Sequence, residues 1–394
     1  MANSMKTQVK HIALSLGAVT EMGYLYAGAD KGIEAEMQGK DNGDTIYYKV
    51  TQLGDPDCVE LGADGTGTAA TAKDIAQVTI PVKMNDSKLM IGINAFERQV
   101  TTIGENKTNA RIGQKLGKKA VGMIIEKDAA IIGNVFVASQ ANAFETFQKA
   151  GAFIKGHVEG TIYGFMDWQI WGDLTGKGQQ AVPCGLAESR FGKGLQGSWT
   201  LIDQLRVISD IKTIEAPDTV TTGAKASISG SKVQVNGTIK AGDMFTIAGV
   251  YAKDVNDMPT QKLFVFRAAE DISTSALTDV TAKLSNAKYG VEETATGWIA
   301  PAAVTNAAVT SVLEAKKRYA ACLIRTEGAQ AFGVMKECGC EGAKYEKSSL
   351  DGVTIHVNAG EDIGAFKTDK RFDMIFASKL VEPRAAALVL YPLS

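Results

Sequence analysis

Three short patterns in the sequence could bind a nucleotide phosphate, a dinucleotide or calcium, but each departs from the required spacing. Gly172-Asp-Leu-Thr-Gly176-Lys177-Gly178 has three residues between its first two glycines where a phosphate loop has four, and Gly178 replaces the Ser or Thr that binds Mg²⁺. No helical pattern opens directly after Gly62–Gly67, as a dinucleotide fingerprint needs. Asp41-Asn-Gly-Asp44 lacks the spacing of a calcium loop. We therefore predict no site of these three kinds.

The cysteines also form no regular framework. The cysteines are Cys58, Cys184, Cys322, Cys338 and Cys340. Because their number is odd, they indicate reduced thiols rather than disulfides. Cys338 and Cys340 could form half of a metal site, but a second ligand pair is missing and His356 is the only nearby imidazole. The favoured interpretation is two small residues around a turn.

Nucleophilic and acid–base catalysis lack their usual residues. The only histidines are His11, His157 and His356, and none of them has a motif partner. No Gly-x-Ser-x-Gly elbow occurs either. We predict no catalytic residue, no cofactor-binding residue and no metal ligand, so the chain is not expected to be an enzyme.

Composition and charge place the chain among globular proteins. Of its 394 residues, 45% are hydrophobic and 22% are charged, a balance that excludes intrinsic disorder. The length accommodates two or three structural units, and many glycines with few prolines favour a turn-rich chain with much β structure. A formal net charge of −2 excludes a polybasic nucleic-acid binder that works as a monomer.

The N-terminal residues contain a short apolar run, Ile12–Val19, which follows two lysines and imitates a secretion signal. Glu21 interrupts the run, and no stretch reaches the roughly 18 apolar residues of a membrane span. Between Val9 and Val19, apolar residues recur at three- and four-residue intervals, which favours an amphipathic helix. We therefore predict a helical arm on a chain of cytoplasmic origin, with a secretion signal as the alternative.

Residues 30–75 are acidic, with ten Asp or Glu against four Lys and a net charge of −6. β-propensity predicts strands at Thr45–Thr51 and Ile75–Val82, with a Gly-rich tip at Gly62–Thr68 between them. This arrangement predicts a long projecting hairpin, which buries little of itself and needs a partner surface. The acidic loop candidates are Asp41, Asp44, Asp55, Asp57, Glu60 and Asp64.

Residues 104–137 carry the clearest helical pattern. One face is apolar and contains Ile112, Leu116, Ala120, Met123 and Ile124. The adjoining face is basic, and its residues are candidates for contact with another subunit or with DNA: Lys107, Arg111, Lys115, Lys118 and Lys119. Glycines within the helix are explained where another backbone approaches closely, because each costs about 1 kcal/mol relative to Ala. A solvated face remains the alternative for the basic stripe.

The middle of the chain mixes structure types. Residues 141–221 combine helix and strand, and we interpret Tyr163, Phe165, Trp168 and Trp171 as core in preference to a ligand platform. Residues 222–300 are distinctly β, with an alternating Lys232–Val235 and a hairpin signal at Asn236-Gly237. These features predict a small β-barrel or sandwich that is inserted into the host domain and folds on its own.

The last segment, residues 301–394, returns to mixed structure. We predict a helical run from Val309 to Lys317. Strands are expected at Ala320–Arg325, Val353–Val357 and Ala385–Tyr391.

The order of these elements resembles the major capsid proteins of tailed phages, which have the HK97-like fold. It is most similar to the P22-type coat proteins, which carry an extra β-domain. The resemblance covers nearly the whole chain. The stretches that carry it most closely are Thr45–Val50, Ala110–Lys119, Gly237–Asp243 with Gly249-Val250, and Glu382–Tyr391. It implies an α+β fold with an N-arm, an extended β-hairpin loop, a long spine helix, peripheral and axial domains, and an inserted small β-barrel domain.

The resemblance also implies domain limits. They are 1–32 for the N-terminal arm, 33–85 for the extended loop, 86–140 for the peripheral domain with the spine helix, 141–221 for the first part of the axial domain, 222–300 for the inserted β-domain and 301–394 for the return segment.

By the same resemblance, the chain forms hexamers and pentamers that close into an icosahedral shell around double-stranded DNA. Its implied partners are other copies of itself, a separate scaffolding protein, a portal and packaged DNA bound non-specifically, with no membrane and no cofactor. The implied location is the virion, after synthesis in the host cytoplasm. An acidic hairpin and a basic helix in one chain fit a lattice, because weak charge contacts repeat many times in a closed shell.

Two other function classes remain as hypotheses. An extracellular β-rich binding module or adhesin would have a genuine signal peptide and paired cysteines or none, and it would leave the basic helix unexplained. A hydrolase with a dispersed active site is disfavoured by the scarcity of histidine. The sequence also leaves open whether the basic stripe faces a neighbouring subunit, DNA or solvent.

Overall fold

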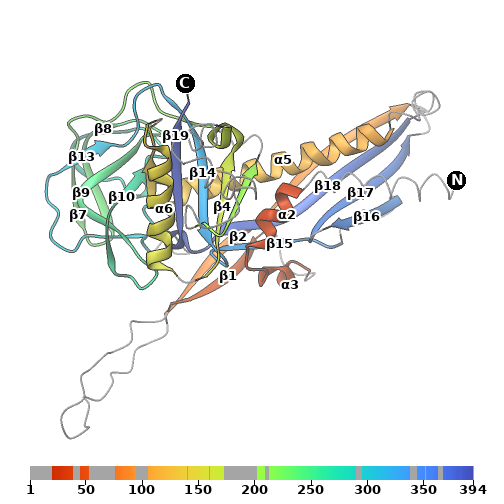
Figure 1. The fold of residues 1–394 in the computed structure, drawn as a ribbon, viewed down its shortest axis with the longest axis horizontal. Helices are drawn as coiled ribbons and strands as arrows, with labels where there is room; N and C mark the ends of the chain where they lie inside the picture. Colours follow the sequence, from red (N-terminus) through yellow and green to blue (C-terminus); the bar gives the residue numbers. More distant parts are fainter. Residues whose placement is uncertain are drawn as a thin grey trace, which may run out of the picture.

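The computed structural model describes most of the chain. The described residues are 20–38, 45–52, 76–94, 105–139, 141–158, 160–172, 202–208, 213–289, 295–337, 344–350, 352–362 and 367–393. They form a mixed α+β protein dominated by strands, as the sequence predicts. Three sheets account for the strands, and Figure 1 shows one at each end of the elongated molecule.

The first six-stranded sheet joins distant parts of the sequence. Its order is β1 (Thr45–Gln52), β2 (Ala76–Asn94), β18 (Lys367–Leu380), β17 (Val353–Asp362) and β16 (Lys344–Leu350), with β15 (Gln330–Val334) also paired to β18. The strand predicted at Ile75–Val82 is therefore confirmed but too short. Beyond Val82 it continues to Asn94, because residues from Met84 onward pair antiparallel with β18.

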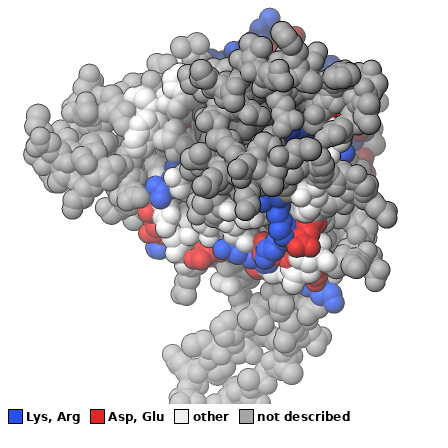
Figure 2. All heavy atoms as spheres, turned by 90° about the vertical axis from the view of Figure 1, so that its right-hand side faces the viewer, with Lys and Arg blue, Asp and Glu red and all other residues white. Residues whose placement is uncertain are grey.

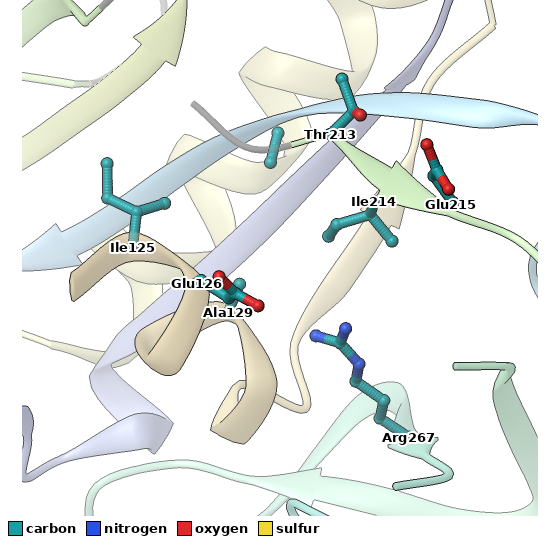
Figure 3. Close-up of a pocket in the computed structure, with 8 residues that line it drawn as sticks. Ile125, Glu126, Ala129, Thr213, Ile214, Glu215 and Arg267 are labelled. Atoms are coloured by element: carbon teal, nitrogen blue, oxygen red, sulfur yellow. The ribbon is translucent and has the colours of Figure 1, made fainter. Parts of the chain in front are cut away.

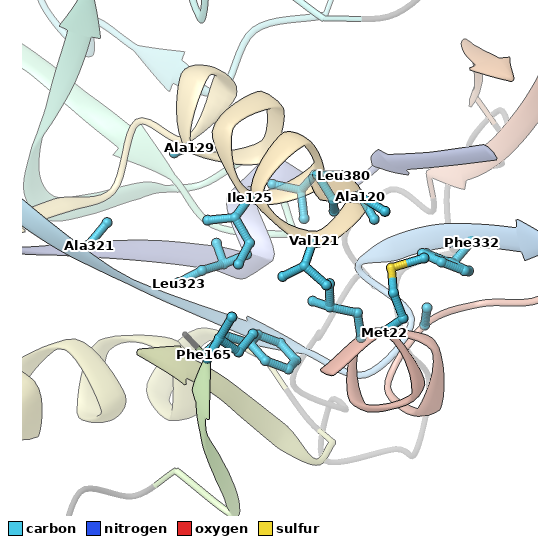
Figure 4. Packing of buried hydrophobic residues seen from close by; sticks show 14 of the residues in the cluster. Met22, Ala120, Val121, Ile125, Ala129, Phe165, Ala321, Leu323, Phe332 and Leu380 are labelled. Atoms are coloured by element: carbon cyan, nitrogen blue, oxygen red, sulfur yellow. The ribbon is translucent and has the colours of Figure 1, made fainter. Parts of the chain in front are cut away.

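The long helix α5 (Glu105–Ile131) lies along β2 and β18 (Figure 1). Its apolar face is buried as predicted, with Met123 only partly buried, and Figure 4 shows the packing of the helix against Met22, Phe165, Leu323 and Phe332. The prediction of helix as far as residue 137 is wrong. Val135–Val137 forms strand β3, which pairs parallel with the C-terminal strand, so long-range pairing overrides the helical periodicity there.

A second six-stranded sheet forms the middle of the molecule. Its order is β3, β19 (Ala386–Pro392), β14 (Arg318–Thr326), β4 (Ile162–Asp167) and β5 (Gln204–Ile208), with β6 (Ile214–Glu215) paired to β14. Helix α6 (Ala143–His157) packs on one face, where Phe147 and Ile154 share a cluster with Met166. The other face carries Phe165 and Leu323 toward α5. Burial on both faces explains why β4 is apolar without alternation.

A seven-stranded sheet lies in the sequence between β6 and β14. Its order is β10 (Pro259–Arg267), β9 (Met244–Lys253), β13 (Ala307–Ser311), β7 (Lys225–Ser229), β8 (Lys232–Ile239) and β11 (Ile272–Asp279), with β12 (Trp298–Ile299) paired to β9. It has its own apolar cluster, which includes Val235, Ile247, Phe266 and Trp298. The structure also contains two short 3₁₀ helices, η1 (Thr281–Lys283) and η2 (Pro383–Ala385).

Two local predictions fail around this sheet. The turn between β7 and β8 lies at Gly230 (φ 60°), and Asn236-Gly237 lies inside β8. At Gly237 a Cβ would lie 2.8 Å from the Ala224 Cβ, so glycine permits a close approach instead of a turn. The helix predicted at Val309–Lys317 is wrong, because Ala307–Ser311 pairs with β7 and β9 as strand β13.

The four aromatic residues of 163–171 do not form one cluster. Tyr163 and Phe165 belong to the core, as predicted, and Trp171 packs partly buried against the cluster under α6. Trp168 is 56% exposed, so its prediction as core is wrong.

Candidate assembly surfaces

The basic face of α5 divides into a described and an undescribed part. Lys115, Lys118 and Lys119 are exposed, while the side chains of Lys107 and Arg111 lie outside the described residues. The buried face beneath them contains Ile112, Leu116, Ala120 and Ile124. The structure thus places three lysines of the predicted stripe on the outside of a helix whose other face is fixed in the core.

Two hydrogen bonds link α5 to strand β2. The Ser87 hydroxyl donates to the Leu116 carbonyl oxygen at 3.0 Å, and the Lys127 ammonium donates to Asn85 Oδ1 at 2.8 Å. Gly117, next to Leu116, is buried. The helix that carries the basic face is therefore attached to strand β2.

The acidic hairpin is described only at its base. All six acidic candidates, Asp41, Asp44, Asp55, Asp57, Glu60 and Asp64, lie outside the described residues. The base itself is an antiparallel ladder that runs from Thr45 opposite Lys83 to Gln52 opposite Ala76. Because β1 ends the strand order of its sheet, one of its edges has no partner strand among the described residues.

The N-terminal segment attaches this base to the body of the protein, which consists of α5, α6 and the two six-stranded sheets. Helix α3 (Ile33–Met37) packs on β1 and β15, with Ile33 and Met37 in a cluster with Ile46, Ile80 and Val82. Asp30 forms a bridge with Ala331, and its carboxylate accepts a hydrogen bond from the Tyr48 hydroxyl. Helix α2 (Thr20–Ala27) precedes it, whereas the apolar repeat between Val9 and Val19 lies outside the described residues.

On the other face of the β1 ladder, Tyr47 and Lys49 are exposed in the part of the chain that the structure describes. Tyr47 is 58% exposed, whereas its neighbours Ile46 and Tyr48 pack against α3 on the opposite face of the strand.

On the end of the molecule seen in Figure 2, described acidic and basic side chains lie intermixed. Exposed ion pairs such as Arg371–Asp86 (3.1 Å) contribute little stability individually.

A buried polar network that the sequence analysis missed connects α2, α5 and the sheets. Asp128 of α5 is 1% exposed and accepts hydrogen bonds from Gln330 Nε2 (2.8 Å) and the Leu380 amide (3.2 Å). The fully buried Arg325 donates to the carbonyl oxygens of Leu25 (2.7 Å) and Gly28 (3.1 Å). One sequence signal existed, since Asp128 lies four residues after Ile124 on the apolar face.

Burial dominates the ionisation of this network. It raises the pKa of Asp128 to about 7, although the charge of Arg325 opposes the shift. It lowers the pKa of Arg325 to about 10, against the charge of Asp128. A carboxyl group that titrates near neutral pH therefore lies inside the support of the basic face.

The seven-stranded sheet is docked closely on the body. A Cβ at Gly133 would lie 1.8 Å from the Phe264 ring, so the ring packs directly on the backbone after α5. The Arg384 guanidinium pairs with Asp257 at 2.9 Å, and the Lys262 ammonium lies 3.8 Å from the centroid of the Phe136 ring. Burial lowers the pKa of Lys262 to about 8.

The described residues contain no cluster of three or more His, Cys, Asp or Glu that could hold a metal ion. Cys322 is fully buried, and burial raises the pKa of its thiol well above the ordinary value. His356 is buried between the Tyr345 hydroxyl (2.7 Å) and the Met335 carbonyl oxygen (2.8 Å). Cys338 and Cys340 lie outside the described residues.

No helix in the described part of the chain combines the length and the apolar character that crossing a bilayer requires.

No family model and no curated protein match this chain. Among solved structures, one titled Mycobacterium phage Che8 has a TM-score of 0.44 at 8% identity and covers 92% of this chain and 88% of its own. The capsid structure of cyanophage P-SCSP1u has a TM-score of 0.43 at 12% sequence identity, and the match covers 91% of this chain and 86% of that chain. A virus-like particle from Pyrococcus furiosus has a TM-score of 0.42 at 8% sequence identity, and the match covers 96% of this chain and 98% of that chain. All three TM-scores lie below 0.5, so no conclusion about family or function rests on them.

Proposed function

We propose that this chain is the major capsid protein of a tailed double-stranded DNA phage and has an HK97-like fold of the P22 type. In this proposal it assembles as hexamers and pentamers into an icosahedral shell, works without catalytic activity and resides in the virion. The proposed domain limits are those that the sequence resemblance implies, except that we extend the inserted β-domain beyond residue 300 to include strand β13.

The observation that carries the proposal is the double use of strand β2. Its first part pairs with β1 as the base of the acidic hairpin, and its continuation lies under α5 beside β18. One sheet therefore contains the two strands that flank the acidic segment and also supports the helix that carries the basic face. Opposite charges on two outward features of one subunit suit contacts between identical copies.

The edge of β1 that has no partner strand among the described residues, and the exposed Tyr47 ring, support a role in association. A strand edge without a partner favours pairing with another chain, and monomeric proteins usually protect such edges. We propose that the acidic hairpin contacts a neighbouring subunit, while a scaffolding protein, a portal and DNA are further partners.

Electron microscopy of the purified protein in negative stain tests the proposal. We expect closed shells, tubes or ring-shaped capsomers, because the contacts repeat between identical subunits. Isolated single particles at all protein concentrations and salt conditions would favour the alternative, an extracellular β-rich binding module or adhesin.

A further inference from the structure

Two of the cavities in the described part of the chain lie where the seven-stranded sheet meets the body, and they differ in how their polar groups are paired. The larger, of about 260 Å³, is lined by Glu126, Glu215 and Arg267 (Figure 3). The Glu215 carboxylate pairs with Arg318 at 3.4 Å. Among the described residues, no side-chain atom in this lining is both buried and without a hydrogen-bond partner. The larger cavity therefore gives no indication of a bound group.

The smaller cavity, of about 10 Å³, has an unpaired acceptor in its lining. Asn134, which lies between α5 and β3, is 2% exposed, and its Oδ1 atom accepts no hydrogen bond from the described residues. The Nδ2 atom fixes the orientation of the amide, because it donates to the carbonyl oxygens of Arg384 (3.2 Å) and Ala386 (3.0 Å). An amide turned over would place Oδ1 against these two oxygens, so the unpaired atom is the acceptor.

A second asparagine in the same lining has all of its polar atoms paired. Asn286 Nδ2 donates to the carbonyl oxygens of Ile132 (3.2 Å) and Val265 (2.7 Å). Its Oδ1 atom accepts from the Arg267 amide at 3.0 Å. Folded proteins pair the large majority of their buried polar side-chain atoms with other protein groups or with ordered water. A group that donates a hydrogen bond to Asn134 Oδ1 is therefore expected in the cavity.

The other groups around the cavity restrict what this donor can be. Lys288 also lines the cavity, and its ammonium has no acceptor among the described residues. A metal ion would need several oxygen ligands, but Asn134 Oδ1 is the one buried side-chain acceptor that the described lining leaves unpaired. An anion without a proton could not donate to this atom. A water molecule can donate to Asn134 and accept from Lys288 at the same time, and the cavity volume is close to that of one water-sized sphere.

We propose that the cavity at Asn134 binds one ordered water molecule. The water donates a hydrogen bond to Asn134 Oδ1 and accepts one from the Lys288 ammonium. Asn134 belongs to the body, whereas Lys288 lies in the stretch that forms the seven-stranded sheet, so the water joins the two parts beside the contact of Phe264 with Gly133. The site belongs to the single subunit and does not depend on whether the chain assembles into a shell.

A structure of the full chain at a resolution that shows ordered water tests this site directly. We expect one density peak in the cavity at about 2.6–3.0 Å from Asn134 Oδ1, the distance of an O–H···O hydrogen bond. An empty cavity, or a side chain that reaches Oδ1 itself, would overturn the proposal. A peak surrounded by several oxygens at about 2.0–2.6 Å would indicate a metal ion and would also overturn it.

A variant tests the second partner of the water. Magnetic relaxation dispersion of the water oxygen measures how long buried waters stay in a protein in solution. Lys288→Met removes the ammonium but keeps an unbranched side chain, and we expect the water to exchange at least about tenfold faster, because a hydrogen bond to a charged donor is lost. The matched control Lys283→Met removes an exposed ammonium on η1 and should leave the exchange unchanged. An equal dispersion in the Lys288 variant and the unaltered protein would contradict the assignment of Lys288.

Discussion

The seven-stranded sheet and the first six-stranded sheet are built by opposite strategies. All strands of the seven-stranded sheet come from one continuous stretch, Lys225–Ser311, and they enclose an apolar cluster of their own. The first sheet instead pairs β2 with β18 across almost the whole chain, and it shares its core with α2, α5 and the second sheet. Strands that are close in sequence can form a unit that folds locally. Long-range pairing instead means that the surfaces of α5 and β1 form only when the complete chain is folded.

At the junction between the two regions, residues of the seven-stranded region contribute to the core of the body. Met244 and Val265 lie in the seven-stranded sheet and Leu313 follows its strand β13, but all three pack in the main core with α5. The local unit therefore completes the core of the body, and its docking restricts how far the two parts can move independently.

The limits of the local unit provide the prediction with the largest effect. Strand β13 lies between β9 and β7, so a fragment of residues 222–300 lacks the strand that joins the two halves of the sheet. We expect a fragment of 216–316 to give dispersed amide signals and a cooperative melt, and 222–300 to give neither. A folded 222–300 fragment would show that the two halves associate without β13.

Charge reversal on α5 tests whether assembly depends on the basic face of this helix. Lys115→Glu with Arg111→Glu should abolish shell formation in electron micrographs while circular dichroism stays unchanged, if the basic face meets a neighbour's acidic hairpin. The matched control, Lys225→Glu with Lys283→Glu, makes the same charge change on the seven-stranded region and should assemble normally.

A charge-swapped hairpin, Asp55→Lys with Asp57→Lys, should then restore some assembly to the α5 variant. Normal shells with impaired, salt-dependent packaging would indicate that the basic face contacts DNA. Normal shells with normal packaging would leave only a solvated face.

The buried Asp128 should make the body respond to pH. A carboxyl whose folded pKa is raised to about 7 destabilises the native state where it is ionised, so stability rises as pH falls from 8 toward the unfolded value near 4. Between pH 8 and pH 5 the gain is about 3 kcal/mol. Asp128→Asn should remove this part of the pH dependence, as measured by denaturant unfolding. Parallel pH profiles of both proteins would contradict this prediction.

The contact between the two regions should tolerate no added side chain. Gly133→Ala places a Cβ where the Phe264 ring lies, and we expect a loss of about 1–3 kcal/mol in thermal or denaturant unfolding. Gly156→Ala in α6 is the matched control, because nothing lies within 4 Å of its Cβ, and it should stabilise by up to about 1 kcal/mol. An equal response of the two variants would mean that Phe264 moves aside freely.

The smallest effect is expected at the thiols. Cys338→Ser with Cys340→Ser should change neither metal content nor assembly, because no second ligand pair accompanies these residues in the sequence. Elemental analysis that finds about one zinc per chain in the unaltered protein would refute this expectation.

Local patterns determined several elements of this protein. The apolar periodicity of Ile112, Leu116 and Ala120 predicts the buried face of α5, and β-propensity predicts β1 almost to its ends. These signals succeed because the spacing of apolar side chains is set by the helix or strand period itself. The exposed positions of Lys115, Lys118 and Lys119 follow from the same periodicity.

Tertiary structure decided what local patterns could not. The partners of Val135–Val137, Asn236-Gly237 and Ala307–Ser311 lie far away in sequence or approach from another strand, so the local helix and turn preferences lose to sheet pairing. The network of Asp128 and Arg325 and the cavity at Arg267 likewise bring together residues from separate segments. A buried charge acquires its chemistry from the groups that surround it, and only the folded chain supplies them.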